Sequence, residues 1–383
     1  MNDSGAETAE MMKELDRKSR IRTVYDASVK KKVTYMILVV LALVASFIAS
    51  VALGAADIPF VDTLKAIAAN LFPWMGVEPS EPYYTNFVYA RSSRAFLCIL
   101  TGMSLAIAGA VMQGTLRNPL VSPFTLGVSS AASFGAAMGL VFWPMLFGAG
   151  TTTIVLFGTK MTDQDFFTVA MAFLFGLLSI LFVVLMTRNR NISRSTVILA
   201  GVIVSYLFQA GVSLAKYLSS DESLREITNW LLGGMWKATM GVDMLIFPVV
   251  MICAIYLMYV SPKINILAAG DEVAESLGVD VNRLRNRSLV VSTLMTSVCL
   301  AFTGIIGFIG LMAPHICRLI IGSDTRYLLP ASAITGAFIL LTSDTVSRII
   351  LRPQEIPVGI AMYILGGIFF MWMMLRRRKE VVI

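Results

Sequence analysis

The chain has 383 residues, of which 57% are hydrophobic and only 14% are charged, and its formal net charge is +7 at pH 7. Soluble globular proteins carry about 25% charged residues, so this chain cannot cover itself with a water-compatible surface. The composition predicts a polytopic membrane protein, excludes a disordered chain, and assigns the positive charge to membrane orientation rather than to a nucleic-acid partner.

Apolar segments long enough to cross a bilayer recur along the chain, since about 20 apolar residues span its core as a helix. The eighth of ten predicted spans is short and interrupted by Pro314, and residues 147–164 are predicted to form a loop. We therefore expect an all-α polytopic fold of about ten transmembrane helices. The predicted spans are residues 33–55, 94–114, 123–147, 165–187, 195–217, 240–260, 287–306, 308–322, 329–350 and 356–375.

The N-terminal span is predicted to be retained. Its apolar core is longer than that of a signal peptide, which has roughly 7–15 residues, and a charged tail precedes it. The chain then divides into an N-terminal tail (residues 1–32), one transmembrane domain (33–376) and a C-terminal tail (377–383).

Loop charges predict the orientation, because cytoplasmic loops are enriched in Lys and Arg. Basic residues concentrate in the segments that are cytoplasmic when the N-terminus is cytoplasmic, and both tails are then cytoplasmic. The basic residues are Lys30, Lys31, Lys32, Arg188, Arg190, Arg194, Lys263, Arg283, Arg285, Arg287, Arg318, Arg326, Arg376, Arg377, Arg378 and Lys379.

The second span carries small residues at every fourth position, Gly102, Ala106 and Ala110. This spacing puts them on one helix face and predicts close helix packing. Arg91 and Arg94 lie at the outer end of this span, where long cations reach the membrane interface.

The RNPLVSP loop, residues 117–123, follows the second span and contains two prolines. Proline fixes its own backbone dihedral and cannot donate to a helix, so the loop is predicted to be a stiff cytoplasmic turn. Without further information it is either a gate or a plain tight turn.

The stretch GDEVAESLGVDVNRLR, residues 270–285, is strongly charged although apolar spans flank it. Acids in its first turn, an apolar stripe of Val273, Ala274 and Leu277, and a Gly278 suited to a left-handed C-terminal position predict a short helix. Asp280 is expected to cap a second short helix. A helix this short is marginal alone, so its stripe must pack on something. Its acids suit the lipid surface poorly, which favours a soluble partner.

The sequence shows no group of residues arranged for catalysis or for metal binding. The four cysteines, Cys98, Cys253, Cys299 and Cys317, are predicted to be buried thiols, and His315 has no neighbouring ligands for a metal. The chain has no phosphate-binding loop, so any ATP must be bound by another chain.

Two long segments resemble the iron-chelate and vitamin B12 family of ABC importer permeases. They are RSSRAFLCILTGMSLAIAGAVMQGTLRNPLVSPFTLGVSSAAS (91–133) and GIIGFIGLMAPHICRLIIGSDTRYLLPASAITGAFILLTSDTVSRIILRPQEIPVGIAMYILGGIFF (304–370), and residues 270–285 resemble the family's coupling segment. The chain departs from the family pattern at Ser93, Ala131 and Ile368, where the family has proline, glycine and proline.

The resemblance implies a permease that binds no cofactor itself and is not an enzyme. Two copies would pair in the cytoplasmic membrane, with two ATPase subunits that bind ATP and Mg on the cytoplasmic side and a substrate-binding protein outside. It implies three sets of residues. The coupling set is Gly270, Asp271, Glu272, Ala274, Leu277, Gly278 and Arg283; the cytoplasmic gate set is Asn118, Pro119, Leu120, Ser193, Ser195 and Thr196; the docking set for the binding protein is Arg91, Arg94 and Arg348.

Other functions fit the residues less well. A secondary transporter needs ionisable groups inside its spans, and the spans offer Asp344 and Lys216, each near an end. Asp344 also stands four residues before Arg348, a spacing that permits an intrahelical pair. An intramembrane enzyme would need partners for His315. We expect import of an iron(III)-siderophore, with haem and corrinoids as alternatives.

Overall fold

The computed structural model describes residues 3–54, 58–147, 152–156, 158–186 and 194–380, without the side chains of residues 3–25, 71, 156, 194 and 376–380. Helices dominate this part of the chain, as the all-α prediction requires. They are α1 (Asp3–Ala52), α2 (Phe60–Leu71), the 3-10 helix η1 (Pro73–Met75), α3 (Tyr83–Leu116), α4 (Val128–Phe147), α5 (Asp163–Met186), α6 (Arg194–Leu218), α7 (Asp221–Leu232), α8 (Met240–Ala269), α9 (Asp271–Ser276), α10 (Val281–Thr303), α11 (Ile309–Ile321), α12 (Thr325–Ile349) and α13 (Val358–Glu380).

Each predicted span coincides with a helix, and 8 of the described helices are long and apolar enough to cross a membrane. The exceptions are α10, which buries many Ser and Thr side chains, and α11. The 13 residues of α11 measure about 20 Å, less than the roughly 30 Å core of a bilayer. Pro314 lies inside α11 without ending it.

Three described elements were not predicted. The prediction that residues 147–164 form a loop is wrong in part. Within this segment, Thr153–Leu156 (β1) and Thr159–Thr162 (β2) pair as an antiparallel hairpin. Helices α2 and α7 occupy segments expected to be loops. Both have 12 residues and are strongly amphipathic, so a search for apolar spans passes over them.

Helix α3 is the centre of the packing, and it contacts α8, α10, α11 and α12. The predicted small-residue face meets α12, where a side chain on Gly102 would collide with the backbone of Gly336. Two turns further on, Gly109 packs closely against the backbone of Gly310 in α11. Since lipid supplies no hydrophobic force between helices, close van der Waals packing of this kind holds the domain together. The packing prediction for this face is confirmed.

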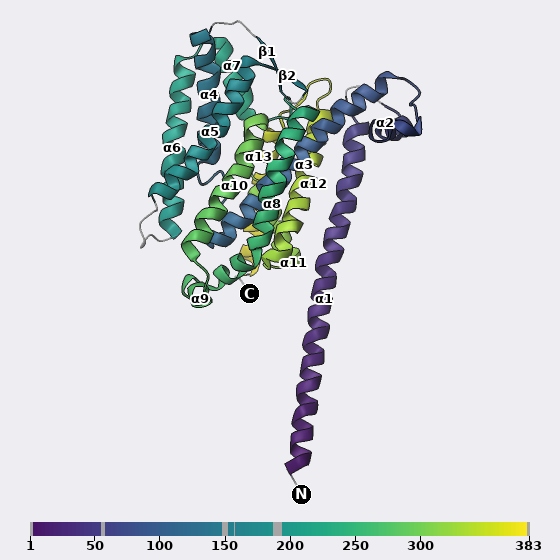
Figure 1. Cartoon of the computed structure of the whole chain (residues 1–383), viewed down its shortest axis with the longest axis vertical. Helices are drawn as coiled ribbons and strands as arrows, with labels where there is room; N and C mark the ends of the chain where they lie inside the picture. The colour runs from purple at the N-terminus through teal and green to yellow at the C-terminus, as the bar shows by residue number, and fades with distance from the viewer. Residues whose placement is uncertain (1–2, 55–57, 148–151, 157, 187–193, 381–383) are drawn as a thin grey trace.

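The two ends of the domain differ in what they carry (Figure 1). Helix α9 and both termini mark one end, called the α9 end here, and α2, α7 and the hairpin mark the opposite end, the α7 end. Helix α1 extends well beyond the rest of the domain at the α9 end.

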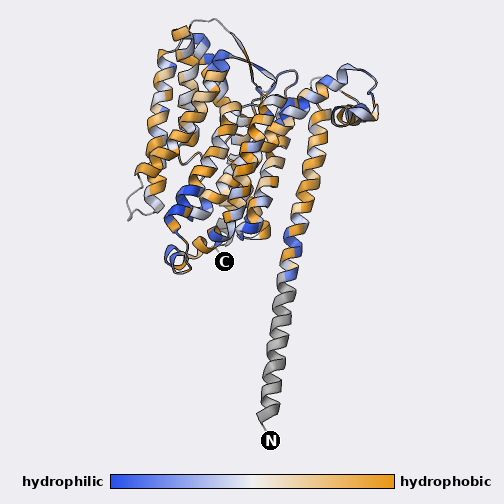
Figure 2. Ribbon diagram, in the orientation of Figure 1, coloured by the Kyte–Doolittle hydropathy of each residue, from blue (hydrophilic) through white to orange (hydrophobic). Residues whose placement is uncertain are grey.

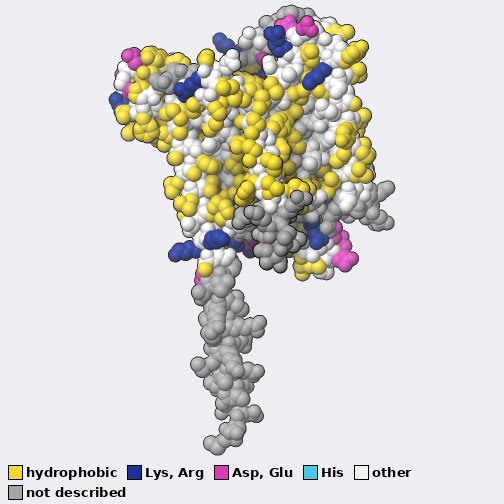
Figure 3. Space-filling model, turned by 180° about the vertical axis from the view of Figure 1, so that it is seen from behind, with side chains coloured by type: hydrophobic (Ala, Val, Ile, Leu, Met, Phe, Trp, Pro, Cys, Tyr) yellow, Lys and Arg dark blue, Asp and Glu magenta, His cyan; other side chains and the backbone are white. Residues whose placement is uncertain are grey.

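Apolar residues cover the helices between the two ends, and charged residues gather at the ends (Figures 2 and 3). A broad apolar surface between two polar rims is what a bilayer requires. The chain is a multi-pass membrane protein.

Candidate functional site

Helix α9 forms as predicted and ends in a Schellman motif. The Gly278 amide donates to the Glu275 carbonyl at 2.9 Å, and the Val279 amide donates to the Ala274 carbonyl at 2.9 Å. Gly278 has φ +78°, and no other atom lies near the position of an added side chain. Its requirement for glycine is therefore conformational rather than steric, because left-handed backbone disfavours side chains.

The apolar stripe of α9 divides between two environments. Ala274 is fully buried against the domain, while Leu277 is 63% exposed and Val273 is 46% exposed. The domain itself therefore covers only the smallest member of the stripe. Leu277 and Val273 therefore keep a large part of their apolar surface exposed at the α9 end.

Asp280 caps a helix as predicted, but this helix is α10 itself. The Asp280 carboxylate accepts from the Arg283 amide at 3.0 Å, and α10 then continues without a break to Thr303. The predicted second short helix is thus the first turn of the seventh predicted span. Helix α9 is therefore joined by a short link to a long helix in the domain core.

Arg285 fixes α9 to α10, and the sequence analysis did not include it in the coupling set. Its Nη2 lies 2.9 Å from Oδ2 of Asp271, and its side chain is buried. Arg283 lies on the exposed side, and its ion-pair partner among the described residues is Asp280 at 3.0 Å. The sequence shows acidic residues in α9 and basic residues at the start of α10. The burial of Arg285, however, depends on how the helices pack.

The RNPLVSP loop is a fixed turn with a projecting tip. Oδ1 of Asn118 accepts from the Leu120 amide at 2.9 Å, and Arg117 ends α3 in the left-handed conformation. Val121 is buried, whereas Leu120 is 62% exposed and Pro119 is also exposed. The loop is therefore anchored on its C-terminal side and presents Leu120 outward.

The other predicted gate segment lies at the start of α6. Ser195 and Thr196 are exposed in its first turn, and Ser193 lies outside the described residues. Helix α6 contacts the start of α4, which follows the RNPLVSP loop: Gly127 lies against Gly201 and Val204. The two gate segments thus belong to adjoining helices within one chain.

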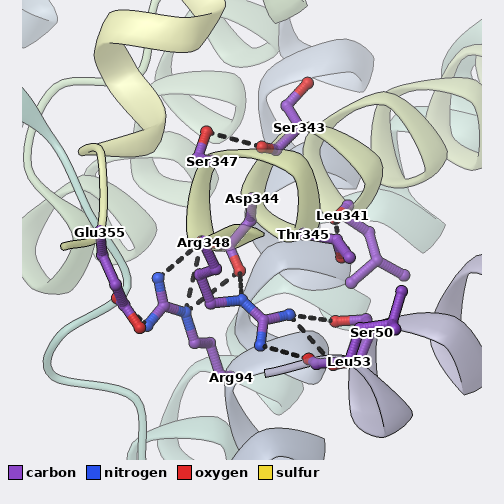
Figure 4. A network of polar contacts seen from close by, with 10 residues as sticks. All are labelled: Ser50, Leu53, Arg94, Leu341, Ser343, Asp344, Thr345, Ser347, Arg348 and Glu355. Carbon is purple, nitrogen blue, oxygen red and sulfur yellow. Dashed lines mark hydrogen bonds and ion pairs between the residues drawn. The ribbon is translucent and has the colours of Figure 1, made fainter. Parts of the chain in front are cut away.

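The three predicted docking arginines all have partners inside the chain, and Figure 4 shows those of Arg94 and Arg348. The buried carboxylate of Asp344 accepts from Nη2 of Arg94 at 2.9 Å and from Nε of Arg348 at 3.1 Å. Arg94 also reaches Glu355 at 2.8 Å. The i,i+4 pair of Asp344 and Arg348 is present, and Arg94 extends it into a network between α3 and α12.

Arginines also connect α1 to this network. Arg348 is only 7% exposed, and its remaining donors go to the C-terminal end of α1 (Figure 4). Arg91 binds the same helix end. The acceptors are the carbonyls of Ser50 and Leu53 and the hydroxyl of Ser50 for Arg348, and the carbonyls of Val51 and Ala52 for Arg91. The carbonyls that end α1 have no intrahelical partner, so guanidinium donors satisfy them.

Sequence reasoning missed one ionisable group inside a predicted span. Asp243, in the first turn of α8, is buried, and its Oδ2 accepts from the Ser93 hydroxyl at 2.7 Å. Ser93 is a position at which the chain departs from the family pattern. A serine donor facing a buried carboxylate is a signal that only the pairing of α3 with α8 reveals.

A polar joint ties α8 to α12 at the α9 end. Asp324 caps α12, accepts from Asn265 of α8 at 2.7 Å and pairs with Arg326 at 2.8 Å. Hydrogen bonding from Arg326, with that from Asn265, lowers the pKa of Asp324 to about 2. The joint holds the α8 end from which α9 follows.

All four cysteines are free thiols and buried, as predicted. Within the described residues there is no group of three or more His, Cys, Asp or Glu side chains that suits a metal ion.

Comparison with known proteins gives consistent matches over most of the chain. The model of the FecCD transport family matches residues 41–376. A protein of Methanocaldococcus jannaschii named as an ABC transporter permease is 37% identical, covering 93% of this chain and 98% of that protein. The hemin transport system permease protein of Yersinia pestis is 34% identical over 76% of this chain and 83% of that protein.

A solved structure, described as an inward-facing conformation of a metal-chelate type ABC transporter, is similar with a TM-score of 0.75 at 26% identity. The similarity covers 89% of this chain and 98% of that one.

Proposed function

Because the chain belongs to the FecCD transport family, whose members are permease subunits of ABC importers, we propose that it carries an iron(III)-siderophore or related iron chelate across the cytoplasmic membrane. Two similar proteins support a metal-chelate cargo: a hemin permease and a transporter of metal-chelate type. ATP is hydrolysed on a separate subunit in this proposal, and this chain supplies the path.

The observation that carries the ATPase partnership is the exposed apolar stripe of α9. Val273 and Leu277 are exposed at the α9 end, on a short helix that also exposes Glu272 and Glu275. Covering a leucine side chain removes it from water and contributes about 1.5–3 kcal/mol. A groove on the ATPase would cover both side chains and leave Asp271 paired with Arg285.

Coupling then follows from the rigid attachment of α9. The Schellman turn at Gly278 and the Asp271–Arg285 pair prevent the helix from yielding when the ATPases close. Since α10 begins three residues after Gly278, a displacement of α9 moves α10 and its neighbour α3. The remaining coupling residues, Gly270 and Glu272, flank this attachment.

The gate proposal uses the projecting tip of the RNPLVSP loop. Leu120 is exposed in one chain and would meet its counterpart, or the start of α6, when two copies pair. Asn118 holds the tip in shape, and its neighbour Pro119 stiffens it. Ser193, Ser195 and Thr196 are proposed as the opposing segment.

Docking of a binding protein at the α7 end is proposed to use Arg91 and Arg94, which keep partial exposure. Arg348 is proposed to act through them, because its own donors are directed at α1 and Asp344. This assignment requires the α9 end and both termini to be cytoplasmic, as the loop charges predict.

Reconstitution tests the function directly. The chain, its ATPase and its binding protein are assembled in vesicles, and ATP-driven uptake is compared for ferric siderophore, haem and cobalamin. We expect the iron chelates to be taken up and cobalamin to be taken up poorly or not at all. A hydrolysis-deficient ATPase variant is the matched control. Uptake that survives this control but stops when ion gradients are dissipated would show a secondary transporter and contradict the proposal.

A further inference from the structure

A cavity of about 550 Å³ lies at the α7 end, between α4, α5 and α7, with the end of α10 beneath it. Its size is that of a small-molecule site. Nothing in the proposed coupling, gating or docking uses it. Its lining combines acidic side chains with large aromatic rings.

Carboxylates outnumber cations in the lining. Glu222 and Glu226 are one turn apart on α7, and Asp165 at the start of α5 lies opposite them. The only ammonium among the described lining residues, Lys237, is bound to Asp165 at 2.7 Å. Glu222 and Glu226 are like charges at i,i+4 and repel each other. Neither forms a salt bridge within the described residues, and the charge of Lys237, which is bound to Asp165, offsets the repulsion on Glu226 only in part.

Glu226 shows the consequence of this crowding. Burial raises the pKa of its carboxyl, and the charges of Glu222 and Asp165 raise it further. Its hydrogen-bond donor is the neutral amide of Gln164 at 3.1 Å, which supplies no positive charge. A positive charge placed between Glu222 and Glu226 would relieve the repulsion.

The walls and the floor suit an organic cation rather than a bare ion. Trp230, Trp236 and Phe302 line the cavity, and indole rings are the best faces for a cation. Thr168 also lines it and is fully buried, and its hydroxyl has no partner among the described residues. This oxygen can accept a hydrogen bond from an ammonium N–H or, for a quaternary ammonium such as choline, from the hydroxyl of the ligand, while the rings contact the alkyl substituents.

We propose that this cavity binds an alkylammonium group presented from the α7 end. The depth of the cavity, down to Phe302 and Gly304, favours an ammonium arm of the transported chelate over a lysine of the binding protein. Only this choice of source depends on the proposed function. Binding of the ammonium group itself does not.

The first experiment measures binding by the purified chain in lipid nanodiscs, with no ATPase, binding protein or chelate. Choline is titrated at constant ionic strength and tryptophan fluorescence is recorded. The matched ligand is 3,3-dimethylbutan-1-ol, which has the shape of choline without its charge. We expect saturable binding of choline and none of the alcohol. Equal binding of both, or no saturable binding of choline, would overturn the proposal.

Variants locate the site. Glu226→Gln and Glu222→Gln should each weaken choline binding about tenfold, and Trp236→Leu should do the same by removing an aromatic wall. Asp221→Asn is the control, because it removes the same charge from the same helix outside the cavity. Equal weakening by Asp221→Asn would show a general surface-charge effect and refute the site.

Uptake experiments distinguish the two sources of the ammonium group. A ferric hydroxamate that carries an ammonium arm is compared with its N-acetylated form. The double variant Glu222→Gln/Glu226→Gln should slow uptake of the first about tenfold and leave the second unchanged. If binding-protein association falls instead and both chelates slow equally, the group is a lysine of that protein. If neither uptake nor association changes, a role for the cavity in transport is refuted.

Discussion

Replacing Asp344 by leucine should destabilise the domain strongly, because this carboxylate joins two arginines in a buried network. Asp344→Leu leaves the guanidinium of Arg348 at 7% exposure with carbonyls as its remaining acceptors. Removing one partner of a buried ion pair costs about 3–5 kcal/mol, because the other charge stays buried and unpaired. Arg94 loses less, since it keeps Glu355.

Glu355 provides the matched comparison. Its side chain is partly exposed and it binds the same Arg94, so Glu355→Gln should cost no more than about 1 kcal/mol. The assay is equilibrium unfolding of the purified chain in mixed detergent micelles. The ratio of the two effects measures how far burial, rather than the mere presence of an ion pair, determines the stability.

A double variant tests the explanation itself. Arg348→Met on the Asp344→Leu background removes the stranded charge, so most of the lost stability should return. The reasoning is refuted if Asp344→Leu and Arg348→Met each leave unfolding unchanged while association with the binding protein falls. In that case Arg348 would act as a docking residue and not as a structural one.

The remaining predictions concern coupling, orientation and acid stability. Leu277→Asp should abolish co-purification of the ATPase without changing the unfolding of the chain, because Leu277 is exposed; Leu277→Met is the control, and unchanged co-purification would refute the docking role of α9. Gly278→Val should cost roughly 1–2 kcal/mol at a left-handed position and uncouple ATP hydrolysis from uptake, which a transport assay with bound ATPase would detect. Cysteine labels at both termini should react only from the cytoplasm and labels near Glu81 only from outside, so an externally reactive C-terminus would contradict the orientation. Since the folded-state pKa of Asp324 is about 2, below its ordinary value, its contribution to stability should be present above about pH 4 and be lost as the pH falls towards 2; Asp324→Asn should remove this acid-sensitive part, and an identical acid profile in both proteins would refute it.

The sequence alone was sufficient for the membrane class, the positions of the predicted spans and the form of α9. These features depend on local properties: apolar length decides a span, and glycine at a left-handed position decides where a short helix ends. The sequence also predicted the small-residue face of α3, because small residues at every fourth position of a helix usually indicate close contact with another helix. Asp280 was recognised as a helix cap because the preference of aspartate for the N-cap position is also a local property.

Tertiary structure alone decided the roles of the charged residues. Arg94 lies on α3, whereas Asp344 and Arg348 lie one turn apart on α12. Whether these side chains project outward or bind one another depends on how α1, α3 and α12 pack. The same holds for Arg285, which is buried because α9 folds back on α10, and for Asp243 beside Ser93. The cavity beneath α7 lies between four segments, and its acidic and aromatic residues are scattered through the sequence from Asp165 to Phe302. The energy of a charge depends on its burial and its neighbours, and neither is a local property of the sequence.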